Sequence, residues 1–238
     1  MTQHKWTRRA MMSGMGVGAL QLTNARPAAA QASEVAFKPS RHPQDAWISN
    51  MPGGHRTIID SVSAKGVGEA LLFARNLFVA NASGYGLKDS DLAIIVCLRH
   101  AGTGFAFNDA MWAKYGLSEY TGLKDATGKP YARNPFHRPT ANELHLLMQA
   151  MQTPTIPMFA GAMPALGIES LQKMGTTFLV CGNALGAWCG ELEARGKGTA
   201  ADLQKELTAN LLPGVTLVPA MVIAIEQAQN AGIAYNRQ

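Results

Sequence analysis

The feature that most constrains the fold is a run of seven apolar residues, Leu-Ala-Ile-Ile-Val-Cys-Leu, at positions 92–98. A strand with one face in water alternates apolar and polar residues, whereas an unbroken short run is typical of a strand covered on both faces. Helices on both sides of a parallel sheet provide that cover. The run therefore predicts an α/β sandwich around a parallel sheet.

The rest of the chain alternates between strand and helix patterns. We expect strands at 57–62, 92–98, 176–181 and 215–218, and helices at 66–82, 106–115, 142–151, 164–173, 184–195, 199–211 and 220–231. Such alternation is typical of βαβ units in a single domain. We place this domain at 56–238, with a polar insertion around 117–139 and an extended arm at 33–55 before it.

The first 32 residues carry the pattern of an export signal. Arg8 and Arg9 lie in a basic start, a weakly apolar stretch follows from Met11 to Leu22, and an A-x-A site ends before Ser33. This order predicts a cleaved twin-arginine signal peptide and a periplasmic protein of 206 residues, 33–238. A membrane anchor is the alternative, but twelve apolar residues span about 18 Å of a hydrocarbon core about 30 Å thick.

Composition and charge exclude several classes of protein. A hydrophobic share of 47% and a charged share of 16% are those of a globular chain, not a disordered one. The formal charge of +5 belongs largely to the leader, since residues 33–238 hold 17 basic and 16 acidic side chains. No nucleic-acid partner is expected. Pro213, Gly214 and Pro219 interrupt the apolar stretch 211–225, so no membrane span is expected after cleavage.

Candidate reactive residues lie where the predicted strands end, because ligands of open parallel sheets bind outside the carboxyl ends of the strands. Arg99 and His100 follow the second strand. His100, beside Arg99, could bind an anion or act as an acid or base. Cys181 ends the third strand and begins a helix, a position that favours the nucleophilic thiolate. Asn183 could cap that helix. Cys181 is therefore the best candidate nucleophile.

The other two cysteines have structural alternatives. Cys97 lies inside the apolar strand and is expected to be a buried packing residue. Cys189, eight residues after Cys181, could resolve an oxidised Cys181 as a disulfide or could pack in the interior.

A soft-ligand site is a second kind of hypothesis. His137 and His145 precede several methionines, which suggests copper or haem ligation. However, His145, Met148 and Met151 have helical spacing, which favours a packed face. We expect no metal site and no cofactor. The chain also lacks GxSxG, HExxH and Walker motifs, so it is not a recognisable hydrolase.

Three segments of the C-terminal part resemble the DsrE/DsrF-like sulfur-relay family: GTTFLVCGNAL at 175–185, LLPGV at 211–215 and GIAY at 232–235. The resemblance implies a flavodoxin-like sandwich with a mostly parallel sheet of four or five strands, assembled into trimers or hexamers. It also implies that Cys181 matches the cysteine that carries a persulfide in the relay members. Those members are cytoplasmic and more compact, whereas this chain has a leader and extra residues near 117–139 and 190–199.

Together these inferences predict a periplasmic DsrE-like homo-oligomer that accepts or relays sulfane sulfur on Cys181, at most a sulfurtransferase or sulfur carrier. Arg99, His100 and Asn183 would line its substrate pocket, and the donor would be a protein or a small sulfur anion. One alternative is a non-catalytic oligomeric binding module for a small ligand, haem or copper. Another is a structural subunit of a larger assembly.

Overall fold

The structure is a computed structural model and describes residues 42–151, 154 and 156–238. The predicted signal peptide, its cleavage site and residues 33–41 of the predicted arm lie outside the described residues. In the part of the chain that is described, no helix combines the length and the hydropathy needed to cross a membrane.

A five-stranded sheet forms the centre of the fold, and all its strands are parallel. The strands are β1 (His55–Ser61), β2 (Leu92–Leu98), β3 (Thr177–Cys181), β4 (Val215–Val218) and β5 (Ala234–Arg237), in the order β4-β3-β2-β1-β5. The chain adds β2, β3 and β4 in turn on one side of β1. Strand β5 then returns to pair with the other edge of β1. The predicted α/β class is confirmed, with the layers of a flavodoxin-like sandwich.

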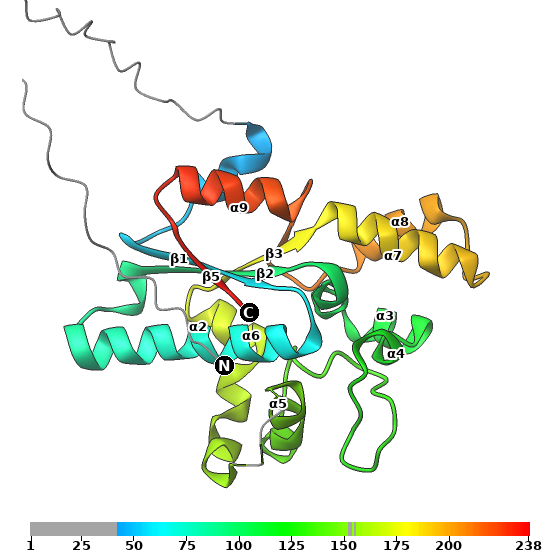
Figure 1. Cartoon of the computed structure of the whole chain (residues 1–238), viewed down its shortest axis with the longest axis horizontal. Helices are drawn as coiled ribbons and strands as arrows, with labels where there is room; N and C mark the ends of the chain where they lie inside the picture. Colours follow the sequence, from blue (N-terminus) through cyan, green and yellow to red (C-terminus); the bar gives the residue numbers. More distant parts are fainter. Residues whose placement is uncertain (1–41, 152–153, 155) are drawn as a thin grey trace, which may run out of the picture. The chain divides into compact units, whose positions relative to one another are not determined.

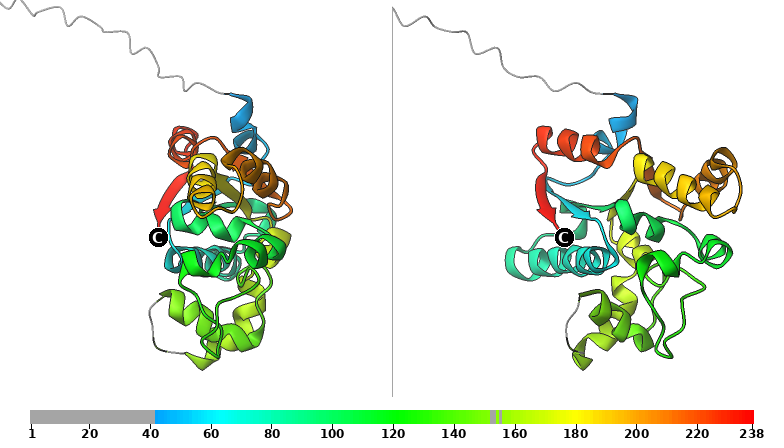
Figure 2. Two further views of the ribbon diagram at one scale, coloured as in Figure 1. Left: turned by 90° about the vertical axis from the view of Figure 1, so that its right-hand side faces the viewer. Right: turned by 45° about the vertical axis from the view of Figure 1, so that its right-hand side comes forward.

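Helices cover both faces of this sheet (Figures 1 and 2). One face packs against α2 (Ala64–Tyr85) and α6 (Ile168–Lys173), and the other against α9 (Met221–Asn230) and the single turn α1 (Ala46–Ser49). The remaining helices lie in the β2–β3 and β3–β4 connections: α3 (Asp109–Tyr115), α4 (Ser118–Thr121), α5 (Leu144–Met151), α7 (Gly182–Ala194) and α8 (Ala200–Ala209).

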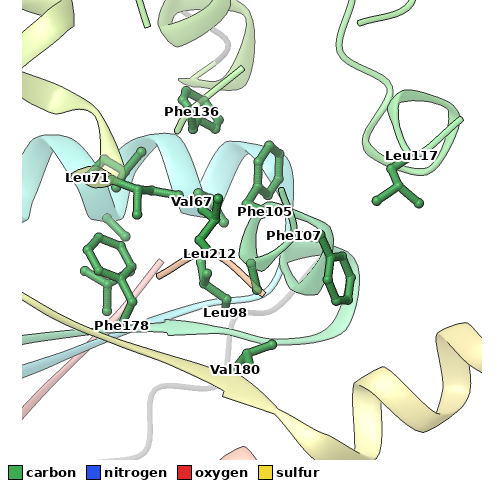
Figure 3. Packing of buried hydrophobic residues seen from close by; sticks show 14 of the residues in the cluster. Val67, Leu71, Leu98, Phe105, Phe107, Leu117, Phe136, Phe178, Val180 and Leu212 are labelled. Carbon is green, nitrogen blue, oxygen red and sulfur yellow. The ribbon is translucent and has the colours of Figure 1, made fainter. Parts of the chain in front are cut away.

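The central strand β2 shows why a strand covered on both faces needs an unbroken apolar run. All seven of its residues are buried. Ile94, Val96 and Leu98 join the larger core, while Ile95 and Cys97 join the core beneath α9. Figure 3 shows side chains from α2 and β3 converging with Leu98 in the larger core. Each face of β2 therefore contributes to a separate hydrophobic layer.

Two parts of the fold differ from the sequence prediction. Strand β5 was not predicted, because its residues Ala-Tyr-Asn-Arg are all exposed and carry no apolar pattern. Its place comes from backbone pairing with β1. The prediction of an extended arm is also wrong for the described part of that segment, because Pro43–Asp45 forms a 3-10 turn and α1 follows it. Trp47 and Ile48 of α1 are buried in the core beneath α9, which fixes this turn.

The predicted polar insertion around 117–139 is part of the domain's core. Its Leu117, Tyr131 and Phe136 are buried in the larger core, although polar residues separate them in the sequence. The amide of the fully buried Asn134 donates to the carbonyls of Phe105 and Phe107, at 2.8 and 2.9 Å. These bonds tie the insertion to the chain that follows β2.

Candidate functional site

A pocket of about 260 Å³ lies at the carboxyl ends of the strands. All four residues singled out from the sequence line it, together with the start of α9; the lining residues are Arg99, His100, Cys181, Asn183, Ala184, Ala220, Met221 and Val222. The structure thus brings together residues that are more than 80 positions apart, because β2 and β3 are adjacent parallel strands.

Cys181 lies at the junction between β3 and α7, where it is the N-cap residue of the helix. Its side chain is nearly buried, with 7% exposed, yet it forms part of the pocket wall. The backbone N–H of Met221 donates to its Sγ at 3.3 Å. An N–H directed at sulfur stabilises negative charge there, as does the positive end of α7.

Close backbone packing positions this junction. A Cβ on Gly182 would lie 2.8 Å from the carbonyl oxygen of Pro219 and 2.9 Å from that of Val218. The N–H of Asn183 donates to the same Pro219 oxygen at 3.1 Å. Glycine is needed here because only it allows the β4–α9 connection to approach so closely. The prediction that Asn183 caps α7 is wrong, since it is the second residue of the helix.

Arg99 is held by a buried carboxylate. Its Nε and Nη2 each donate to an oxygen of Asp60 at 2.7 Å, and the hydroxyl of Tyr235 donates to the same carboxylate at 2.9 Å. Asp60 has no exposed surface, and its hydrogen bonds raise the pKa of Arg99 above the ordinary value. The Arg99 charge is therefore largely balanced within the protein, and the pair presents little net charge to the pocket.

His100 has a strained backbone. Among the described residues, it is the one non-glycine with positive φ, at 55°. Its carbonyl accepts a hydrogen bond from Trp188 Nε1 at 3.1 Å, and its side chain is exposed at the pocket. Such conformations cost on the order of 1 kcal/mol or more and often occur at functional sites. The hydrogen bond from Trp188 helps to hold the backbone of His100 in this conformation.

The other two thiols differ from Cys181 in their surroundings. Cys97 is fully buried in β2, and burial, followed by the nearby Asp60 charge, raises the pKa of its thiol. Burial also raises the pKa of Cys189, which packs in the larger core, with Gln204 at 3.6 Å from its Sγ. Cys181 instead belongs to the core beneath α9. Cys189 and Cys181 are both free thiols and belong to different cores, so interior packing is the better interpretation of Cys189.

The histidine and methionine segment shows no metal centre in the described residues. No three His, Cys, Asp or Glu side chains described there could together hold a metal ion. Met148 and Met163 pack with leucines in a small third core, and His145 Nε2 lies 3.3 Å from the hydroxyl of Tyr131. The packed-face alternative fits this arrangement.

No family model, curated protein or solved structure matches the chain.

Sequence reasoning found four lining residues but missed two that support them. Asp60 lies near the end of the first strand but was not singled out, and Tyr235 could not be placed because β5 has no local pattern. Trp188 carried a signal, since it lies seven residues after Cys181 and therefore on the same face of a helix.

Proposed function

We propose that this protein is an exported DsrE-like sulfur carrier in which Cys181 accepts sulfane sulfur as a persulfide and passes it on. The observation that carries the proposal is the position of the Cys181 sulfur, which lines a pocket and accepts the Met221 N–H at 3.3 Å. Of the three cysteines, the other two are at most 1% exposed. Cys181 is thus the thiol that a donor reaches most easily.

The transfer needs no external oxidant. The Cys181 thiolate attacks the outer sulfur of a donor R–S–SH; the new sulfur–sulfur bond forms as the donor's breaks, and R–S⁻ leaves. The proton of the transferred sulfur stays on it, giving Cys181–S–SH. Arg99, His100 and Asn183 supply the polar wall beside the reacting atoms, and a second thiolate removes the sulfur by the same step.

Export and assembly are parts of the same proposal. The Arg8-Arg9 leader directs export and is removed before Ser33, and the folded protein forms trimers or hexamers. Val222 and Ile223 of α9 support assembly, since they are 65% and 48% exposed and Val222 lines the pocket. The mass of the protein recovered from periplasm, measured under denaturing and native conditions, reports both properties.

The test of sulfur transfer is the intact mass after treatment with inorganic polysulfide and then with dithiothreitol. We expect a reversible gain of about 32 Da, one sulfur atom, that Cys181→Ser abolishes. Cys189→Ser is the matched control and should keep the gain. Polysulfide is small enough to reach any partly exposed thiol. An unchanged wild-type mass, or a gain retained in Cys181→Ser, would therefore contradict the proposal and favour the binding-module alternative.

A further inference from the structure

A second hollow of about 470 Å³ lies next to the cysteine pocket. The two share His100 and Ala184 as walls. The second hollow is lined mainly by apolar and aromatic side chains; its lining residues are His100, Ala101, Tyr120, Ala184, Ala187, Trp188 and Glu191. The shared walls make the two hollows adjacent parts of one binding region.

The aromatic wall of this hollow is held in place before any ligand binds. The Trp188 and Tyr120 rings have their centroids 5.0 Å apart, and Trp188 Nε1 donates to the His100 carbonyl at 3.1 Å. The indole also lies so close to Gly104 that a Cβ there would be 2.8 Å from it. A rigid aromatic surface binds flat apolar groups with little loss of conformational entropy.

Helix α7 connects this wall to the reactive sulfur. Residues 181, 184, 188 and 191 follow one another at helical spacing, so they form one stripe along α7. Trp188 comes seven residues after Cys181, a rise of about 10 Å. A compound with an aromatic ring and a short arm ending in sulfur matches that length.

The charges around the region favour a neutral ligand. Two of the described lining residues, Arg99 and Glu191, are of the Arg, Lys, Asp and Glu types, and each forms an ion pair within the protein. Asp60 binds Arg99 through two hydrogen bonds, and Arg195 Nε lies 2.7 Å from Glu191. A small inorganic anion therefore meets little uncompensated positive charge, whereas an apolar group gains contact with Trp188 and Tyr120.

We infer that the sulfur partner of Cys181 is a small neutral organic sulfur compound whose aromatic or apolar group rests against Trp188. The inference rests on the proposed function and replaces the small sulfur anion expected from the sequence with an organic persulfide, which reacts with Cys181 in its protonated, uncharged form R–S–SH. Its apolar group occupies the Trp188 hollow, and its outer sulfur reaches Cys181 past His100 and Ala184.

The test compares two neutral thiosulfonates with the same leaving group, benzyl and methyl methanethiosulfonate. In both reactions the Cys181 thiolate forms a disulfide with the R–S group, the sulfur–sulfur bond of the reagent breaks and methanesulfinate leaves. Each rate is divided by the rate with free cysteine. We expect the benzyl reagent to be favoured about tenfold in the wild type, which corresponds to about 1.4 kcal/mol.

Two variants test whether the preference comes from the hollow. Trp188→Ala removes the aromatic wall, and Ala187→Gln fills the hollow from an exposed helix position without opening a core cavity. Both should abolish the benzyl preference, and Ala187→Gln, which keeps the hydrogen bond from Trp188 to the His100 carbonyl, should also leave the methyl rate unchanged. Tyr120→Phe should keep the preference. Equal normalised rates in the wild type would overturn the inference. If polysulfide still loaded Cys181, the sulfur-carrier function would stand; if it did not, both would fail.

Discussion

At the scale of single residues, Asp60 has the most demanding position in the site. Its carboxylate is completely buried, and it accepts three hydrogen bonds, two from Arg99 and one from Tyr235. A buried carboxylate is stable only when its partners compensate for the lost hydration. The orientation of Arg99 at the pocket therefore depends on a residue that does not line the pocket itself.

Replacing that carboxylate should be costly. Asp60→Asn keeps the shape of the side chain but leaves the Arg99 charge without its counter-ion. We expect the free energy of unfolding to fall by about 3–5 kcal/mol, the usual cost of breaking a buried pair. Urea denaturation followed by circular dichroism measures the change.

Glu169→Gln is the matched control for this substitution. Glu169 also accepts Nε and Nη2 of an arginine, Arg138, but this pair lies on the surface, with 68% of the arginine side chain exposed. The control should leave the urea midpoint almost unchanged, because solvent already screens the charges. If both variants lost the same stability, burial would not be what makes the Asp60 pair important.

At the scale of elements, the junction of β3 and α7 requires close contact with the β4–α9 connection. Gly182→Ala would push a methyl group against two carbonyl oxygens of the backbone, which have no flexible side chain to move. We expect a loss of about 1–3 kcal/mol in unfolding free energy and a change in the reactivity of Cys181. Thermal unfolding and alkylation rates measure the two effects.

Gly186→Ala, on the same helix, is expected to increase the unfolding free energy rather than to decrease it. A Cβ at Gly186 would have open space around it, so alanine only restricts the unfolded chain and should add about 0.5–1 kcal/mol. Cys181 should then react at the wild-type rate. A loss of stability in both variants would mean that α7 tolerates no added side chain, and the contact with Pro219 would not be the cause.

At the scale of the whole molecule, buried tyrosine and cysteine side chains make stability depend on alkaline pH. Burial, followed by the Glu143 charge, raises the pKa of Tyr131 to about 12, and burial raises the pKa of Cys97 as well. In the unfolded chain a tyrosine loses its proton near pH 10. Between these values the unfolded state binds fewer protons than the folded state, so stability falls as the pH rises.

The urea midpoint should accordingly decrease between about pH 10 and about pH 12, the interval that separates the two states of Tyr131. Tyr131→Phe should make that decrease shallower, because one group that titrates differently in the two states is removed. Tyr85→Phe serves as the control, since Tyr85 is 79% exposed and solvent surrounds it in both states. Equal slopes for wild type and Tyr131→Phe would contradict this account.

Much of the fold could be predicted from the sequence because hydrophobic periodicity is local. The seven apolar residues of β2 predicted a strand covered on both faces, and its alternate residues do enter two separate cores. Their positions at the ends of predicted strands made Arg99, His100, Cys181 and Asn183 candidate site residues, and all four line one pocket in the structure. Their role in sulfur transfer stays a prediction.

Local patterns were enough to predict the α/β class, the central strand and the residues at the strand ends, because each of these depends on neighbours in the chain. Local patterns did not predict that β5 pairs with β1, that Asp60 and Tyr235 hold Arg99, or that Tyr120 lies against Trp188. These contacts join segments 39 to 177 residues apart. They arise from strand order and layer packing, which single-segment patterns do not encode.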